Sequence, residues 1–296
     1  MGVLKVGGGN ILERWPVNDD EVWLKRSGCD GGPNPGLPSC GHSQPIQLKG
    51  LPVNRYIILK ILSDSTQQEL SSKTNTNALI KLKHPSGGYL PDINLQTGNH
   101  QDPGSNKLCG KAFMVEMVPA TDTESSCPTQ HYVDTGEMDT VMVISSPANS
   151  KSAVWGGLMA ARAKVKGVKG VVIDGRCRDL AEHRAADYLV FARGHSVLGQ
   201  LTFTRPSRIQ VPITIHPVAD SFGSSDMNKQ IIFPPTTVNP YDIIVGDEDG
   251  LVVIPHAEIE EVIKLCTKNT QVDQKCLEHL KAGHTIADTF SQFRGK

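Results

Sequence analysis

Residues 153–184 read AVWGGLMAARAKVKGVKGVVIDGRCRDLAEHR, and this stretch decides the fold. Its first half, 153–167, is a helix candidate, and VKGVVIDG at 168–175 is an apolar run typical of a buried strand. Further helical and strand-like segments alternate along the chain. Such alternation predicts an α/β fold, here with some antiparallel hairpins.

The expected helix opens on two glycines, Gly156 and Gly157, and places Leu158, Ala161 and Val165 on one face. A helix N-terminus presents unpaired amides and the positive end of a dipole, so it can bind a carboxylate or a phosphate. Glycines there let a ligand approach the backbone. The alternative is that they only permit close packing of the helix on the sheet.

The strand ends in a cluster of opposite charges that contains Arg178, Asp179 and Glu182. In open α/β sheets, ligands usually bind beyond the carboxyl ends of strands, where helices begin. The guanidinium of Arg178 can grip a carboxylate at two points. Asp179 is a hard oxygen ligand for a magnesium-like ion, and Glu182 can be a second ligand or orient the ion's waters. The alternative is a solvated group of ion pairs.

Composition excludes several classes of protein. The 296 residues include 30 Lys plus Arg and 31 Asp plus Glu, a formal net charge of -1, which gives no general attraction to nucleic acid or membranes. No apolar run is long enough to span a bilayer, and the N-terminus lacks the pattern of a secretory signal. We therefore expect a soluble, cytoplasmic protein.

The seven cysteines include no C-x-x-C pair, and their number is odd. This pattern argues against a disulfide framework and against a zinc site. Cys177 lies inside the charged cluster and is a candidate thiol nucleophile, although a free cysteine is more often a small buried residue. His131, His183 and His195 lie near polar segments but show no metal-ligand spacing.

The rest of the chain supplies further elements. Residues 56–82 show helical spacing with a polar interruption suited to a helix cap, and 256–282 predict a long amphipathic helix with a candidate break at Asn269. Strands are expected at 108–120, 139–147, 188–194 and 211–215, and 241–255 predicts two strands joined by the acidic turn Asp247–Gly250.

Two segments do not fit a compact core. Residues 1–55 are rich in Gly, Pro, Ser and Asn, and we expect an irregular extension. Residues 216–236 form a connection too long for a compact domain, which predicts a surface insertion. The remaining domain spans 56–296.

The spacing from Gly157 across twenty residues to Arg178-Asp179, then two residues to Glu182, gives G-x20-R-D-x2-E. With GGYLPDI, VFARG and VNPYDIIVGDEDGLVVIP, it resembles the RraA-like family, most closely its fungal members. That family includes 4-hydroxy-4-methyl-2-oxoglutarate aldolases that also decarboxylate oxaloacetate. The resemblance covers most of residues 70–296, but not the first 60 residues or the insertion.

The resemblance implies a swivelling β/β/α fold, assembled as a homotrimer or a dimer of trimers with sites between subunits. It implies a class II aldolase or decarboxylase that uses Mg²⁺, or alternatively Mn²⁺, on a short 2-oxo acid. It assigns substrate binding to Arg178 and the segment Gly156, Gly157, Leu158 and Met159, and the metal to Asp179. A water-ordering carboxylate from the neighbouring subunit falls near Asp273.

The sequence departs from the family pattern at three positions. Many bacterial aldolases carry an acidic residue where Gly157 stands, and Glu182 is the candidate to replace it. Asn77 stands where an Asp is common. Tyr241 replaces a turn glycine, which suggests an altered loop.

The chemistry implied by these residues is cleavage of a C3–C4 bond, by retro-aldol reaction or decarboxylation, through a pyruvate enolate. The rival interpretation is a non-catalytic protein-binding module, because some relatives are named for inhibiting a ribonuclease. The acidic turn Asp247–Gly250 would then be a candidate contact surface.

Overall fold

The computed structural model describes residues 71–98, 103–218 and 233–295, together with the backbone of four short strands nearer the N-terminus. The chain divides into two compact units, Met1–Ser63 and Asp64–Lys296. In the first unit, β1 (Val3–Val6) pairs with β2 (Asn10–Glu13), and β3 (Glu21–Val22) with β4 (Ile46–Gln47), all antiparallel. These strands lie where the sequence predicted an irregular extension, and the boundary near residue 55 stays a prediction.

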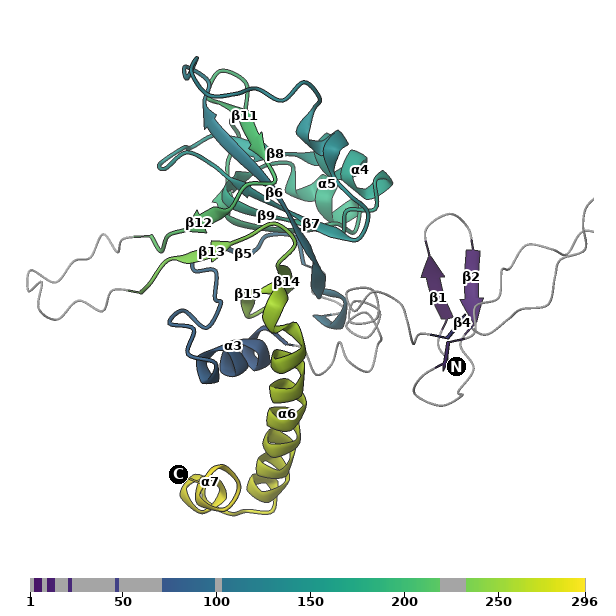
Figure 1. Cartoon of the computed structure of the whole chain (residues 1–296), viewed down its shortest axis with the longest axis vertical. Helices are drawn as coiled ribbons and strands as arrows, with labels where there is room; N and C mark the ends of the chain where they lie inside the picture. The colour runs from purple at the N-terminus through teal and green to yellow at the C-terminus, as the bar shows by residue number, and fades with distance from the viewer. Residues whose placement is uncertain are drawn as a thin grey trace, which may run out of the picture. The chain divides into compact units, whose positions relative to one another are not determined.

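The second unit is a mixed α/β domain (Figure 1). Its helices are α3 (Ser72–Lys81), α4 (Gly157–Val165), α5 (Leu180–Ala185), α6 (Ile259–Lys281) and α7 (Ile286–Arg294). Its strands are β5 (Asn94–Leu95), β6 (Leu108–Pro119), β7 (Thr140–Ser145), β8 (Ala153–Trp155), β9 (Gly170–Cys177), β10 (Leu189–His195), β11 (Thr204–Ile209), β12 (Ile213–Ile215), β13 (Thr236–Val238), β14 (Ile243–Asp247) and β15 (Gly250–Ile254). Short 3-10 turns lie at Pro103–Ser105, Tyr132–Thr135 and His256–Glu258.

Nine of the described strands form one sheet in the order β15-β14-β6-β7-β9-β10-β5, with β11 also on β6 and β8 also on β9. The strands β6, β7, β9 and β10 run parallel, whereas β14, β15, β11 and β5 are antiparallel to their neighbours. The two end strands, β15 and β5, contact each other. The sheet is therefore nearly closed on itself, like a barrel.

The parallel strands are apolar on both faces because both faces are covered. Alternate residues of β7 show this: Met142 and Ile144 belong to the core under α4, and Val141 and Val143 to the core inside the curved sheet. Since side chains alternate along a strand, a continuous apolar run fills two cores at once. The strands predicted at 108–120, 139–147 and 188–194 are confirmed.

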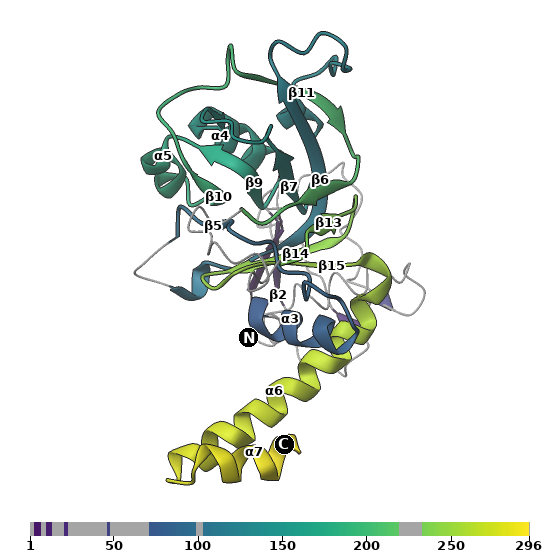
Figure 2. The same ribbon diagram turned by 90° about the vertical axis from the view of Figure 1, so that its left-hand side faces the viewer.

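The helices lie in two groups (Figures 1 and 2). In both views α4 and α5 lie at one end of the unit, and α6 and α7 extend at the other, with α3 beside β15 and α6. Helix α3 begins at the cap Ser71, whose hydroxyl accepts the amide of Thr74 over 3.2 Å. The earlier part of the helix predicted at 56–82 lies outside the described residues.

Two expectations about helices are wrong. Helix α6 runs unbroken through Asn269. In α4 the predicted apolar face is the solvent face, since Leu158 and Val165 are 79% and 78% exposed, and the helix instead packs through Ala160 and Ala163. Alanines allow the close helix–sheet approach that larger residues would prevent.

The strands on either side of the long connection, β12 and β13, pair with each other. Ile213 lies opposite Val238, and Ile215 lies opposite Thr236. Most of the segment predicted as an insertion, residues 219–232, lies outside the described residues. The hairpin predicted at 241–255 is confirmed as β14 and β15. Its acidic turn is tied into the fold, because Asp247 accepts bonds from the amide and hydroxyl of Ser72 over 2.8 and 2.6 Å.

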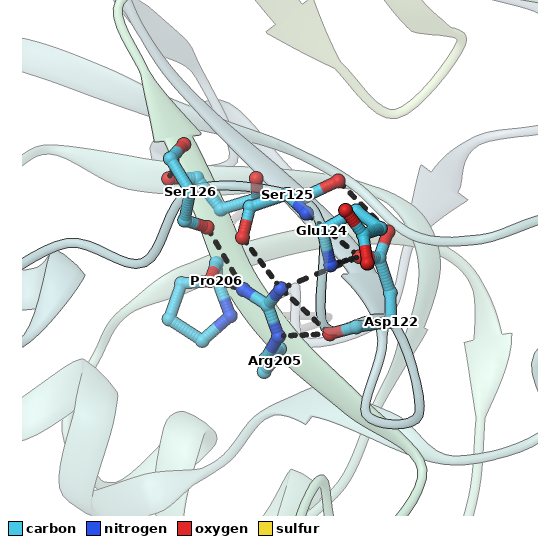
Figure 3. A network of polar contacts seen from close by, with 7 residues as sticks. Asp122, Glu124, Ser125, Ser126, Arg205 and Pro206 are labelled. Atoms are coloured by element: carbon cyan, nitrogen blue, oxygen red, sulfur yellow. Dashed lines mark hydrogen bonds and ion pairs between the residues drawn. The ribbon is translucent and has the colours of Figure 1, made fainter.

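The loop at 121–126 is anchored by one arginine of β11 (Figure 3). Arg205 donates hydrogen bonds to the carbonyls of Asp122, Ser125 and Ser126. The shortest bond to each carbonyl is 2.8 Å. Within the loop, Asp122 accepts the amide and hydroxyl of Ser125, both over 2.8 Å. These bonds lower the pKa of Asp122, the amide of Ser125 contributing most.

Candidate active site

Asp179 reaches back from the end of β9 to the start of α4. Its Oδ2 accepts a hydrogen bond from the amide of Gly157 over 3.0 Å. Gly156 is the N-cap of α4 and has no side chain that could accept an amide. The carboxylate of Asp179, which lies beyond the end of β9, caps the helix instead. The positive end of the helix dipole stabilises a negative charge at this position.

The backbone of Asp179 supports this placement. Its φ of 61° and ψ of 42° lie in the left-handed region, which few non-glycine residues occupy. Such strain often lies at functional sites. The neighbouring Arg178 is anchored by its amide, which donates to the carbonyl of Trp155 over 2.9 Å, and its Nε lies 3.4 Å from Oδ2 of Asp179.

Both glycines leave room for the carboxylates that lie over them. A Cβ at Gly156 would lie 2.5 Å from Oδ2 of Asp179, and a Cβ at Gly157 would lie 1.6 Å from Oε2 of Glu182. The two carboxylates therefore occupy the space in which side chains of the glycine pair would stand. The glycines therefore make room for two carboxylates, a role that packing of the helix on the sheet does not by itself explain.

The site is open to solvent. The side chains of Arg178 and Asp179 are 46% and 31% exposed, and Glu182 is exposed. A partly exposed ion pair contributes little to stability. Of the predicted site residues, the structure brings together Gly156, Gly157, Arg178, Asp179 and Glu182, with Leu158 and Met159 following in the first turn of α4.

A segment that sequence reasoning missed lies against Arg178. A Cβ at Gly199 would lie 2.9 Å from Nη1 of Arg178, and the carbonyl of Leu198 accepts the amide of Ala153 over 2.9 Å. The surrounding residues, Ser196–Phe203, connect β10 to β11. In the sequence, this segment could be noticed only as a short stretch, SVLGQLTF, that is partly apolar and carries no charged residue.

The predicted neighbour-subunit residue, Asp273, lies on α6 and bonds Nη2 of Arg294 over 2.5 Å. Helix α6 extends away from α4 and α5 in both views (Figures 1 and 2). Within one chain Asp273 is therefore not part of the glycine-pair site. Its contribution to a neighbouring subunit stays a prediction.

Cys177 does not have the properties of a nucleophile. It is fully buried, its Sγ lies 3.7 Å from the carbonyl oxygen of Gly194, and burial raises its pKa to about 11. A thiol with such a pKa is protonated at neutral pH. The five cysteines of the described residues are all free.

The three histidines differ in their surroundings, and His183 is near enough to Asp179 and Glu182 for their charges to act on its pKa. His183 is completely buried, and burial is the main cause that lowers its pKa, so it is neutral at physiological pH. His131 accepts the amide of Val133 over 3.4 Å and stacks on Tyr132, a structural role. His195 is exposed at the end of β10.

The donors present fit a hard divalent cation. The described residues hold no cluster of three or more His, Cys, Asp or Glu side chains suited to a metal. Magnesium, however, commonly takes one or two carboxylates and keeps its waters. Asp179 and Glu182 offer two carboxylates at one solvent-accessible glycine pair, which suits such an ion and does not suit zinc.

Comparison with known proteins identifies the class. A family model described as RraA-like, Aldolase/RraA, matches residues 90–253, more than half of the chain. The fold defined by the curled sheet is that of solved RraA structures, and the chain belongs to the RraA-like family.

Two curated relatives illustrate the likeness. An uncharacterized protein of Methanocaldococcus jannaschii is 30% identical over 141 residues, which cover 48% of this chain and 59% of that protein. A Halalkalibacterium halodurans protein, provisionally named as a 4-hydroxy-4-methyl-2-oxoglutarate aldolase, is 29% identical over 147 residues, 50% of this chain and 60% of that protein. The chain thus spans about 60% or less of the first curated relatives.

Two solved structures match over more of the chain. An uncharacterized Pseudomonas syringae protein is 26% identical with a TM-score of 0.59, over 77% of this chain and 97% of that one. RraAS2 of Streptomyces coelicolor, described as an unusual member of the RNase ES inhibitor RraA protein family, is 19% identical with a TM-score of 0.54, over 75% and 98%. This second likeness shows the fold alone. No helix among the described residues is long and apolar enough to cross a membrane.

Proposed function

We propose that the chain is a divalent-metal-dependent carbon–carbon lyase that acts on short 2-oxo acids. The reaction would be retro-aldol cleavage of 4-hydroxy-4-methyl-2-oxoglutarate, decarboxylation of oxaloacetate, or both. The observation that carries the proposal is the hydrogen bond from the amide of Gly157 to the carboxylate of Asp179, with the guanidinium of Arg178 beside it. Relatives provisionally named as aldolases support a lyase.

Arg178 would bind the C1 carboxylate of the substrate. Its guanidinium is charged at all relevant pH values and presents a planar fork of donors. The amide of Gly157 is already bonded by Asp179, so the helix amide that remains for the substrate is that of Leu158. The side chain of Met159 packs against the core under α4, so this residue would support the same first turn from within.

Asp179 and Glu182 would hold the divalent cation, magnesium first and manganese as the alternative. When bound, this ion supplies Lewis-acid stabilisation of the 2-oxo group. Asp179 is held in place by its bond to the helix amide, which fixes its orientation before any ligand arrives. Glu182 would also orient the water that relays a proton.

The two reactions share one bond-breaking step. The C3–C4 bond breaks, and its electron pair moves to C3 and the C2 oxygen to form the enolate of pyruvate. In the retro-aldol reaction the C4 hydroxyl loses its proton, and in decarboxylation CO₂ leaves. Arg178 would keep a positive charge beside the developing enolate, where electrostatic stabilisation has its largest effect.

A homotrimer, or a dimer of trimers, would complete the site. The outer face of α4 offers Leu158 and Val165 to a neighbouring copy, since both are largely exposed. Asp273 would approach that neighbour's glycine pair. The substitution Val165→Lys should weaken this contact and lower the mass measured by light scattering. A mass unchanged at low protein concentration would argue against α4 as the contact.

The second candidate is a non-catalytic module that binds a ribonuclease or another protein. The Streptomyces neighbour favours it, because that protein is placed in a family of ribonuclease inhibitors, although the likeness extends to the fold alone. The acidic turn is a less suitable contact surface than its sequence suggested. Asp247 is bonded to Ser72, and Glu248 accepts the side chain of Asn106 over 2.8 Å.

A coupled assay separates the two candidates. Lactate dehydrogenase reports pyruvate released from oxaloacetate, with magnesium or with EDTA, and a no-enzyme control corrects for spontaneous decarboxylation. We expect release that depends on magnesium and stops on chelation. No release from oxaloacetate or from 4-hydroxy-4-methyl-2-oxoglutarate would favour the binding module. Absence of nucleic-acid binding and a cytoplasmic location remain predictions from charge and sequence.

A further inference from the structure

The start of α4 is carried by β8, a very short strand. β8 has three residues, Ala153–Trp155, and among the described strands it pairs only with β9. The carbonyl of Trp155 accepts the amide of Arg178 over 2.9 Å, and the next residue, Gly156, is the N-cap of α4. The position of β8 therefore sets how the helix amides lie relative to the charged side chains that follow β9.

A tyrosine from another part of the chain bonds the middle of this strand. The hydroxyl of Tyr132 donates to the carbonyl of Val154 over 2.8 Å, and both residues are buried. Burial raises the pKa of the Tyr132 phenol above its usual range, so the hydroxyl keeps its proton and remains a donor around neutral pH. The bonded carbonyl precedes the N-cap Gly156 by only two residues.

The 3-10 turn that carries Tyr132 is itself fixed. The hydroxyl of Thr135 donates to the carbonyl of Tyr132 over 2.6 Å, and the ring of His131 stacks on that of Tyr132 with 4.7 Å between the centroids. In the same turn, Asp134 accepts the Nε of Arg162 on α4 over 2.6 Å. Tyr132 is therefore held firmly, and its bond limits how far β8 can move.

We propose that Tyr132 is a positioning residue for the glycine-pair site, which it reaches through the carbonyl of Val154. It supports the half of the site that belongs to β8 and α4, where the helix amides lie. Asp179 and Glu182 belong to the other half, because they follow β9 and lie at α5. Loss of the Tyr132 bond should therefore weaken binding of the substrate carboxylate and leave the two carboxylates able to bind a cation. This expectation about ligands rests on the proposed lyase function.

A second buried tyrosine in the same core provides a matched control. The rings of Tyr132 and Tyr188 both lie beside that of Trp155, with centroids 6.4 and 6.2 Å from it. The hydroxyl of Tyr188 is also buried, but it has no hydrogen-bond partner among the described residues. Tyr132→Phe and Tyr188→Phe therefore remove the same atom from the same core, and only the first change breaks a bond to β8.

Hydrogen–deuterium exchange, followed by mass spectrometry, tests the positioning without reference to any activity. In Tyr132→Phe, peptides that contain the amides of Gly157 and Arg178 should exchange about fivefold or more faster than in the wild type, because a carbonyl of β8 has lost its donor. Peptides from β14 and β15 are the internal reference and should keep the wild-type rate, and Tyr188→Phe should change none of these rates. Unchanged rates in Tyr132→Phe, or a uniform rise that includes β14 and β15, would overturn the proposal.

Two small probes supply the second measurement. Oxalate, an analogue of the pyruvate enolate, should inhibit pyruvate release from oxaloacetate with a Ki about fivefold or more higher in Tyr132→Phe than in the wild type. Binding of Mn²⁺ without substrate, followed by EPR, should keep a Kd within about twofold of the wild type in both tyrosine variants. A Mn²⁺ Kd that rises as much as the Ki would show a general loosening of the site and would contradict the proposal.

The possible failures can be told apart. If the wild type neither binds Mn²⁺ nor releases pyruvate, the lyase function fails, and the exchange rates still decide whether Tyr132 positions β8. If the wild type is active and exchange at Gly157 and Arg178 does not change in Tyr132→Phe, the inference fails and the lyase function stands. If Tyr132→Phe does not fold, Thr135→Val replaces it, because this variant removes the donor to the carbonyl of Tyr132. It should give the same pattern with smaller changes, and absence of that pattern would overturn the proposal.

Discussion

Oε2 of Glu182 lies 1.6 Å from the point at which a Cβ of Gly157 would stand. The carboxylate of Glu182 thus fills the place that a side chain at position 157 would occupy. Many bacterial aldolases of the family carry an acidic residue at this position. Glu182 therefore brings a carboxylate to this position of the helix, from α5 instead of α4.

Gly157→Ala should lower activity without unfolding the protein. The new methyl group would displace the carboxylate of Glu182, which is the far end of an exposed, flexible side chain. We expect kcat for pyruvate release to fall about 10- to 100-fold, with Glu182→Gln showing a similar loss. The double variant should lose little more than either single variant, since both act on one carboxylate. Full additivity of the two losses would contradict this account.

Cys177 should be dispensable. Because burial raises its pKa to about 11, it should not react with iodoacetamide at pH 7.5, whereas the exposed Cys127 should. Mass spectrometry of the labelled peptides measures both. Cys177→Ala should retain pyruvate release within about a factor of three. Rapid labelling of Cys177, with loss of activity, would reinstate it as a nucleophile.

Tyr241→Gly should stabilise the fold. Tyr241 has φ of 68°, so it adopts the left-handed conformation that the glycine of the family pattern would adopt without strain. The gain should be about 1 kcal/mol, after the greater chain entropy of glycine is subtracted. Urea unfolding measures it. Tyr241→Phe, which removes only a long 3.4 Å contact to Glu137, is the control and should change little.

Arg205→Lys should loosen the loop at 122–126 (Figure 3). A lysine cannot reproduce the planar fork that binds three carbonyls, so we expect a loss of about 2 kcal/mol. Limited proteolysis should cut the loop in the variant and spare the wild type. Equal resistance of the two proteins would show that the arginine is not what holds the loop.

The same loop should open in acid. The pKa of Asp122 is lowered in the folded protein, chiefly by the amide of Ser125, so its contribution to stability is present above the unfolded-state pKa of about 3.9. That contribution is lost as the pH falls through the lower, folded-state pKa. At pH 5 the Ser125 amide should therefore exchange more slowly in the wild type than in Asp122→Asn. This difference in exchange rate should disappear at low pH, once Asp122 is protonated.

The sequence predicted the parts of the fold that local pattern determines. Apolar runs marked β6, β7, β9 and β10, and the end of β9 placed Arg178 and Asp179 beside the start of α4, as expected. The elements it missed include β11 and α7, as well as shorter ones that depend on distant partners. Strand β8 has three residues paired with β9, and helix α5 starts from the left-handed turn at Asp179.

The faces of helices were harder to assign than their positions. Leu158 and Val165 recur at helical spacing, but α4 approaches the sheet through alanines, and periodicity cannot distinguish a core face from an exposed apolar face. The polar Asn269 suggested a break in α6. In the structure it accepts a bond from Lys81 over 2.5 Å, so a contact with α3 accommodates the residue inside an intact helix.

The position of Glu182 over Gly157 and the apolar segment beside Arg178 depend on three-dimensional proximity. Gly199 follows Arg178 by twenty-one residues and reaches it only because β10 returns the chain to the same edge of the sheet. A single sequence could supply the residue types but not this juxtaposition.

The central claim is that Asp179 holds a metal needed for catalysis, in addition to capping α4. Asp179→Asn tests it most directly, because an asparagine oxygen can still accept the amide of Gly157 while the charge is lost. Pyruvate release from oxaloacetate should fall at least about 100-fold in the presence of magnesium, with the Tm kept near that of the wild type. Magnesium-dependent release retained at the wild-type rate in Asp179→Asn would contradict the account.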